Sequence, residues 1–424
     1  MSTRKAFALM AQDGQERLVA SNVLIAGVTA LCFLSAGRAF GADPGVSDKE
    51  IKIGNFMPYS GPASAYGAIG KAIAAYFKKV NDEGGISGRQ INFISYDDSF
   101  SPPKAVEHTR RLVEHDQVFL IFQSVGAASN SAIWKYMNDK KVPQLFVASS
   151  SSKWADPQGH PWTMGWQPTS ETEANIYAQY LLKNKPNGKI AVLYQNDDYG
   201  KDYLKGLKHG LGSAAAKMIV AEQSYEVTDP TVDSQMANLK NSGADVFFNV
   251  TTPKFAVQAI KKVADLGWKP LQLLNNVSAL IATVMKPAGV EASKGIVTAG
   301  YLKDYDDPQW KDDPAMKEWL AWMKKYYPEG NLHDPLSVYG YCVSQTLVQV
   351  LKQCGNDLTR ANVMKQAANL KDLTLPMLLP GIKINTSPTD FFPITQERLA
   401  QFDGERGVLF GELIDARAST MVRK

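Results

Sequence analysis

A run of four serines and a lysine, SSSSK at residues 149–153, contains the residue types that could most directly do chemistry in this chain. Ser150 and Lys153 fit the pattern S-x-x-K, in which a serine nucleophile works with a lysine. The run could also be a flexible linker, or a row of hydroxyls that holds a ligand. It follows an apolar stretch, PQLFV at 143–147, so the elements around it must decide between these uses.

The nucleophile interpretation needs partner motifs that this chain lacks. In enzymes with S-x-x-K the motif starts a helix, and S-D-N and K-T-G tripeptides complete the site. Neither tripeptide occurs here, and there is no Walker loop, no dinucleotide fingerprint after the first strand and no G-x-S-x-G. A linker is disfavoured because only five residues, 148–152, separate the strand from KWADP. We therefore predict no catalytic residue, and an exported α/β hydrolase is the enzyme alternative.

The histidines are scattered along the chain and do not suggest a metal site. His108 and His115 share a predicted helix two turns apart, without a nearby cysteine or acidic cluster that resembles a metal site. His160, His209 and His333 are isolated in the sequence. We therefore predict neither a metal nor a cofactor.

The first 42 residues have the pattern of an export signal. Basic residues precede the apolar run VLIAGVTALCFL at 23–34, and small residues follow it. A run of about 12 residues fits a signal-peptide core and is shorter than the roughly 20 residues of a spanning helix. We expect a signal peptide at 1–42, cleaved after Ala39, Gly41 or Ala42, with Met10 as a second possible start. The alternative is an uncleaved amphipathic tail.

The cysteines and the charge narrow the class further. Cys32 lies in the expected leader but follows Leu31, so a lipid anchor is not expected. Cys342 and Cys354 share a helical pattern, and twelve steps of 1.5 Å separate them by about 18 Å, too far for a disulfide. The net charge is +4 and the leader supplies +2 of it, which leaves no electrostatic case for nucleic acid. Export without an anchor indicates a Gram-negative periplasm.

The pattern of elements predicts two α/β units in series, followed by a different tail. Strands are expected at 51–56, 90–96, 118–122 and 143–147, with helices from Tyr66, from the prolines of 101–115 and at 129–138. The pattern restarts with strands at 189–194, 217–223, 245–250 and 271–275, and helices at 171–184, 200–213, 231–240 and 254–266. The tail has helices near 313–326, 336–354 and 359–370 and a β-rich stretch at 381–410. Alternating strands and helices predict parallel sheets that bind ligands at their carboxyl ends.

Five segments carry a resemblance to a known family. They are IKIGNFMPYSGPASAYG, VNDEGGISGRQINFISYDDSFSPPKAVE, KVPQLFVASSSSKWADP, IAVLYQNDDYGKDYLKGLKHGL and AIKKVADLGWKP. Over roughly residues 48–420 the chain resembles the leucine/isoleucine/valine-binding family of type I periplasmic binding proteins, the solute receptors of ABC importers. The resemblance implies an α/β fold of two doubly wound parallel-sheet lobes joined by three crossovers, which close around a small molecule. It implies lobes of 48–170 plus 301–378 and 171–300 plus 379–420, a monomer, and a permease partner in the inner membrane. A ligand-sensing receptor module is the distant alternative to a free solute receptor.

Two loops at the ends of first-lobe strands are expected to contact the ligand. In FQSVGAASNS at 122–131, the resemblance places contacts at Ala127 and its neighbours, including Ser129, whereas a tight strand-to-helix turn is the alternative. In the serine run, the resemblance implies that Ala148 and Ser150 hold the ligand carboxylate and part of an ammonium group. The alternative there is a serine that caps a helix, with the other serines as bystanders.

Aromatic and polar residues from both lobes complete the expected site. The resemblance implies that Tyr66 lines the pocket from the first lobe and that Tyr199 closes over the ligand from the second. Thr252 matches a position that is commonly aromatic, so the pocket is expected to be roomier or more polar. Each tyrosine could instead be a half-buried packing residue. One of Asn196, Asp197 and Asp198 is expected to cap the following helix.

Asn275 and Asn276 stand where amino-acid binders of the family carry an acidic residue for the ligand ammonium. A buried ammonium group without a counter-charge is costly. We therefore expect a carboxylate or amide ligand without an α-ammonium group, such as an aromatic or aliphatic acid. A branched-chain or other neutral amino acid is the alternative. The acids that could substitute are Asp97, Asp98, Asp197 and Asp198, and the aromatics that could stack on a ligand are Phe100, Trp154 and Trp166.

Overall fold

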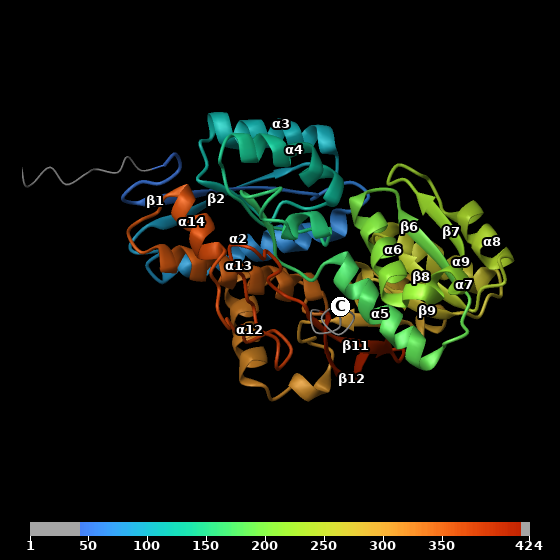
Figure 1. Cartoon of the computed structure of the whole chain (residues 1–424). Helices are drawn as coiled ribbons and strands as arrows, with labels where there is room; N and C mark the ends of the chain where they lie inside the picture. Colours follow the sequence, from blue (N-terminus) through green and yellow to red (C-terminus); the bar gives the residue numbers. More distant parts are fainter. Residues whose placement is uncertain (1–42, 417–424) are drawn as a thin grey trace, which may run out of the picture. The chain divides into compact units, whose positions relative to one another are not determined.

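The computed structural model describes residues 43–416, so the expected signal peptide and Cys32 lie outside the described residues (Figure 1). The first sheet has five parallel strands in the order β2-β1-β3-β4-β5. Its strands are β1 (Glu50–Met57), β2 (Gln90–Asp97), β3 (Leu120–Phe122), β4 (Gln144–Val147) and β5 (Thr163–Gly165). All four strands predicted between residues 51 and 147 are confirmed. The short β5 was not predicted.

Helices lie on both faces of the first sheet. They are α2 (Gly67–Asp82), α3 (Pro102–Arg110) and α4 (Ala127–Asp139). Phe56 and Ile121 of the strands pack in one cluster with Ala105 of α3 and Ile133 of α4. The opposite face packs against α2, which in turn packs against the tail helix α13 (Pro335–Cys354). Coverage on both faces explains why the inner strands β3 and β4 are almost entirely apolar.

The second sheet has seven strands in the order β12-β11-β10-β9-β8-β6-β7. Its strands are β6 (Ile190–Gln195), β7 (Ile219–Tyr225), β8 (Val246–Val250), β9 (Leu271–Leu274), β10 (Val297–Gly300), β11 (Gln396–Phe402) and β12 (Gly407–Asp415). Strands β6 to β10 are parallel, whereas β11 and β12 are antiparallel additions at one edge. The four strands predicted between residues 189 and 275 are confirmed, and β10 was not predicted.

Side chains of β8 alternate between two helical layers. Val246 and Phe248 pack with α5 (Ser170–Asn184) and α6 (Asp198–Leu211), whereas Phe247 packs with α8 (Asp233–Asn241) and α9 (Pro253–Asp265). This period of two follows from the pleat of a strand. The shorter helices of this part are α7 (Ala215–Met218), α10 (Lys286–Ala288) and α11 (Val290–Ser293). The predicted parallel α/β architecture, with helices on both faces of each sheet, is therefore confirmed.

The tail is divided between the two sheets. Its helices are α12 (Pro314–Tyr326), α13 and α14 (Arg360–Ala367), of which α12 and α13 pack against α2. Its strands β11 and β12 extend the second sheet, although the predicted β-rich stretch forms regular strands only from Gln396. The chain therefore passes between the sheets three times, after β5, after β10 and before β11.

The cysteines follow their prediction. Helix α13 carries Cys342 and Cys354, and both thiols are buried and free. Burial raises the pKa of each thiol, so both are poor nucleophiles. Within residues 43–416, no helix has the length and apolar character needed to cross a bilayer.

Candidate ligand-binding site

One cavity of about 180 Å³ lies where strand ends of both sheets meet. From the first sheet it is lined by the loops after β3 and β4, at 125–127 and 148–150. From the second sheet it is lined by Gln195 at the end of β6 and by Thr252 and Asn276 after β8 and β9. A cavity of about 150 Å³ can hold a benzene molecule, so this one has room for a small organic ligand.

Seven of the nine predicted site residues line this cavity. They are Tyr66, Ala127, Ala148, Ser150, Tyr199, Thr252 and Asn276. The other two, Ser129 and Asn275, do not line it, and their surroundings explain why. The tertiary structure therefore brings together residues from six separate loops, while their contact with a ligand stays a prediction.

The inner half of the serine run faces the cavity. Ser149 and Ser150 line it, and Ser150 Oγ lies 2.8 Å from Ser170 Oγ at the start of α5. The short 3-10 turn that follows, Ser152–Ala155, receives no side-chain cap from Ser151. The alternative was a serine that caps a helix with its side chain. The hydroxyl of Ser151 does not cap this turn.

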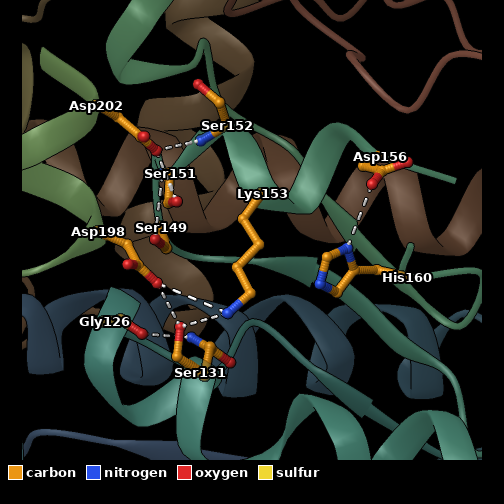
Figure 2. Close-up of polar contacts among 11 residues, drawn as sticks. Gly126, Ser131, Ser149, Ser151, Ser152, Lys153, Asp156, His160, Asp198 and Asp202 are labelled. Atoms are coloured by element: carbon orange, nitrogen blue, oxygen red, sulfur yellow. Dashed lines mark hydrogen bonds and ion pairs between the residues drawn. The ribbon is translucent and has the colours of Figure 1, made fainter. Parts of the chain in front are cut away.

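The outer half of the run holds a carboxylate of the protein itself (Figure 2). Ser151 Oγ donates to Asp202 Oδ2 over 2.7 Å, and the Ser152 amide donates to the same oxygen over 2.8 Å. Asp202 is on α6, so this contact joins the first sheet's loop to the second sheet's helix. Partial burial raises the pKa of Asp202 above its ordinary value. Neutral hydroxyl and amide donors of this loop can thus bind a carboxylate.

Lys153 does not pair with Ser150. Its Nζ lies 3.2 Å from Ser131 Oγ and 3.7 Å from Asp198 Oδ2, and Ser131 Oγ donates to Asp198 over 2.8 Å (Figure 2). The ion pair of Lys153 and Asp198 joins the loop after β4 of the first sheet to the start of α6, which packs on the second sheet. The geometry therefore gives no support to a serine–lysine nucleophile.

Helix α4 begins at the cavity, and its first turn is shaped by buried contacts. Gly126 precedes it with φ of 97°, and a Cβ at this glycine would lie 2.7 Å from the ring of Phe100. Ser129 lies outside the lining because its hydroxyl faces Asp98 Oδ2 at 3.3 Å. The Ser129 hydroxyl is therefore engaged within the protein, and its contact with a ligand stays a prediction. The side-chain amide of Asn130, in the same turn, donates to the backbone carbonyls of Ser124 and Gly126.

The two predicted tyrosines lie on the cavity wall and are held by the second sheet. Tyr66 OH donates to the Val277 carbonyl over 3.2 Å, and burial raises its pKa. Tyr199 OH receives a hydrogen bond from Asn275 Nδ2 over 2.6 Å. Asn275 is fully buried behind Tyr199, so it positions this tyrosine and does not line the cavity. Asn275 is therefore not among the lining residues, and its direct contact with a ligand stays a prediction.

Thr252 lines the cavity while its hydroxyl is engaged with neighbouring groups. Its Oγ1 lies 3.3 Å from Tyr225 OH and 3.4 Å from Gln195 Oε1. The backbone amide of Thr252 also donates a hydrogen bond to Tyr225 OH, over 2.9 Å. Thr252 therefore offers the cavity a small side chain where the family commonly has an aromatic ring.

A buried carboxylate lies directly behind Asn276, which sequence reasoning missed. The backbone amide of Asn276 donates to Glu173 Oε1 over 2.7 Å, and Tyr177 OH donates to the same oxygen over 2.8 Å. Tyr203 OH donates to Glu173 Oε2. Burial raises the pKa of Glu173 to about 7. Glu173 does not line the cavity, and protein donors occupy both of its oxygens.

The four acids expected as substitutes are engaged elsewhere. Each carboxylate accepts a hydrogen bond within the protein. The donors are the Ser60 hydroxyl for Asp97, the Phe100 backbone amide for Asp98, the Gly200 backbone amide for Asp197 and the Ser131 hydroxyl for Asp198. None of the four lines the cavity. Of the three aromatics, only Phe100 lines it, whereas Trp154 and Trp166 are core residues. The lining residues that sequence reasoning missed include Lys303, Asp304, Asp307, Trp310, Tyr301 and Tyr339.

Comparisons with known proteins agree with this architecture. A sequence model of the family described as periplasmic binding protein matches residues 50–407. The Leu/Ile/Val-binding protein homolog 1 of Brucella abortus (strain 2308) is 24% identical over 343 residues, which are 80% of this chain and 87% of that protein.

Two solved structures are similar in fold. A branched-chain amino acid ABC transporter protein from Thermus thermophilus with bound valine has a TM-score of 0.78 and 15% identity, and the match covers 89% of this chain and 100% of that one. The fatty acid ABC transporter substrate-binding protein of Thermomonospora curvata has a TM-score of 0.75 and 24% identity, over 89% and 96% of the two chains. At these identities the structures establish the fold, which is that of type I periplasmic binding proteins.

Proposed function

Because this chain belongs to the periplasmic binding protein family, we propose that it is the solute receptor of an ABC importer. It captures a small carboxylate-bearing ligand between two lobes, 48–170 plus 301–378 and 171–300 plus 379–420. The ligand carboxylate binds at Ala148 and Ser150, and the rest of the ligand is apolar and carries no ammonium group. The protein binds and releases this ligand without chemical change.

The composition of the cavity wall carries this proposal. The loops after β3, β4, β6, β8 and β9 offer hydroxyls, amides and apolar side chains to the cavity, and the two acidic lining residues, Asp304 and Asp307, follow β10. The serine loop already binds one carboxylate, that of Asp202, with neutral donors alone. An ammonium group at Asn276 would be buried without a free counter-charge, which is costly.

A neutral amino acid is the second candidate, and Glu173 is the observation that favours it. This carboxylate contacts the amide of Asn276, so a rearranged side chain could face an ammonium group. The similar proteins include both kinds of ligand by name, a branched-chain amino acid and a fatty acid. We favour the acid because both oxygens of Glu173 already accept hydrogen bonds from the protein.

The mode of action follows from the position of the site between the lobes. A ligand that contacts Ser150 on one lobe and Tyr199 on the other stabilises the closed arrangement. We propose that this closed form docks as a monomer onto an inner-membrane ABC permease. The location is the periplasm, after cleavage of the signal peptide near residues 39–42.

A thermal-shift screen of the purified protein with matched ligand pairs tests the proposal. Each pair compares an amino acid with the acid that lacks its amino group, for example leucine with 4-methylpentanoate and phenylalanine with 3-phenylpropanoate. We expect the acids to raise the melting temperature, because a ligand at 100 times its Kd stabilises by about 2.7 kcal/mol. Stabilisation by micromolar leucine or valine, without any by the acids, would establish the amino-acid alternative.

A further inference from the structure

The cavity continues well beyond the predicted ligand contacts, along the second sheet. Its lining includes residues in or directly after β6, β8, β9, β10, β11 and β12, which are six neighbouring strands. Neighbouring strands lie about 4.8 Å apart, so five intervals give a wall of roughly 24 Å. One amino acid spans only about 3.6 Å of backbone, and a ligand of that size leaves most of this wall uncovered.

The far part of the wall is made by one face of the β11–β12 hairpin. Ala400 and Phe402 of β11, and Gly407 and Leu409 of β12, all line the cavity. Ala400 pairs with Leu409, and Phe402 pairs with Gly407, so the four positions share one face of the hairpin. On the opposite face, Val408 is 39% exposed.

Apolar side chains dominate this extension. Those on its other walls are Leu280, Ile281, Met285, Leu302, Trp310 and Leu336. The charged groups nearby are already engaged within the protein. Lys303 Nζ lies 2.8 Å from Asp313, Asp304 accepts a hydrogen bond from the Asp306 amide over 3.0 Å, and Asp307 accepts one from the Gln309 amide over 3.1 Å. The extension therefore favours a hydrocarbon chain, and the ligand needs no second polar group there.

Two glycines keep the extension open. A Cβ at Gly407 would lie 3.8 Å from Ala400 Cβ, an ordinary contact, and a Cβ at Gly300 would meet no atom within 4 Å. Neither glycine has a positive φ, so a larger residue fits the backbone at both positions. The space is therefore set by side-chain size and can be filled by substitution.

From this geometry we propose that the ligand is an unbranched aliphatic carboxylate, whose carboxylate binds at the serine loop and whose chain runs towards β11 and β12. The inference rests on the proposed function and names the substrate class within it. Each buried methylene contributes about 0.8 kcal/mol, which corresponds to about fourfold in Kd. Affinity therefore rises with chain length until the chain reaches the end of the extension.

Isothermal titration calorimetry of the purified protein with butanoate, hexanoate, octanoate and decanoate tests this. We expect Kd to fall about fourfold for each added methylene, and octylamine not to bind, because it lacks the carboxylate. Gly407→Leu fills the extension, so it should abolish the gain from butanoate to octanoate while butanoate binding stays within twofold of wild type. Val408→Leu, on the outer face of the same hairpin, should keep the full gain.

Thermal unfolding of each variant shows that it is folded, and Gly300→Val provides a second filling variant if Gly407→Leu does not fold. Equal affinity for butanoate and octanoate would overturn the extended chain but leave a carboxylate receptor in place. If no acid of any length binds, both the extended chain and the proposed function fail. A gain with chain length that survives both filling variants would place the chain elsewhere and also overturn the inference.

Discussion

The Asp202 carboxylate lies 2.7 Å from the hydroxyl of Ser151 and 2.8 Å from the Ser152 amide (Figure 2). Asp202 is 51 and 50 positions from these two serines in the sequence. The serines follow strand β4 of the first sheet, whereas Asp202 is on helix α6, which packs on the second sheet. The serine loop therefore has two sides. Ser149 and Ser150 face the cavity, and Ser151 and Ser152 hold the second sheet's helix α6.

Removal of this bridge should weaken ligand binding without touching the cavity. Asp202→Ala deletes two hydrogen bonds to a charged acceptor, and such a bond contributes about 1.5 kcal/mol or more. If the bridge supports the closed arrangement, octanoate should bind roughly tenfold more weakly by calorimetry. Asp265→Ala, at an exposed position of α9, is the control and should bind as wild type. Unchanged affinity in Asp202→Ala would show that the bridge does not contribute to closure.

The carboxylate grip can be tested with neighbouring serines. Ser150→Ala removes a lining hydroxyl, and a typical hydrogen bond of 1–1.5 kcal/mol predicts roughly five- to twelvefold weaker carboxylate binding. Ser152→Ala is the matched control, because Ser152 Oγ has no hydrogen-bond partner and does not line the cavity. Equal affinities of wild type and Ser150→Ala, measured by calorimetry, would refute the assignment of Ser150.

Tyr199 should contribute mainly through its ring. Tyr199→Ala removes an aromatic wall of the cavity, and we expect at least about a tenfold rise in Kd for octanoate. Tyr199→Phe keeps the ring and loses the hydrogen bond from Asn275 and the longer one to the Thr251 carbonyl, so its Kd should stay closer to that of wild type. If Tyr199→Ala binds normally in the same titration, the site is not at this cavity.

Glu173 predicts a dependence of stability on pH. Its pKa is raised to about 7 by burial, from an ordinary value of 4.5, and the nearby buried Glu397 also has a raised pKa. The folded state therefore binds protons more tightly than the unfolded state, and the free energy of unfolding should fall as pH rises from about 4.5 to about 7.

Chemical denaturation of wild type and Glu173→Gln across pH 5 to 8 measures this effect. The glutamine stays neutral, so the variant should show a flatter profile and gain stability relative to wild type at pH 8. A profile identical to that of wild type would mean that Glu173 does not titrate in this range. Glu397→Gln provides the comparison for the second carboxyl.

The strands that could be predicted are those with a strong local pattern. The run VFFNV of β8 is apolar except for Asn249 and is recognisable because it is buried on both faces. The strands β5 and β10 have three and four residues and no comparable apolar run, so they are defined by pairing, β5 with β4, and β10 with β9 and β11. Their existence depends on tertiary contacts that no local pattern contains.

The sequence alone determined the alternation of strands and helices, and hence which loops end the parallel strands. The resemblance to a known family then identified seven of the residues that line the cavity, in the loops where strand ends of parallel sheets converge. Only the tertiary structure decided what each side chain contacts. It turned Asn275 towards Tyr199, placed Glu173 against Asn276 from 103 residues away, and opened the apolar extension along β11 and β12. These contacts join residues distant in the chain, so their partners depend on packing that local residue patterns do not specify.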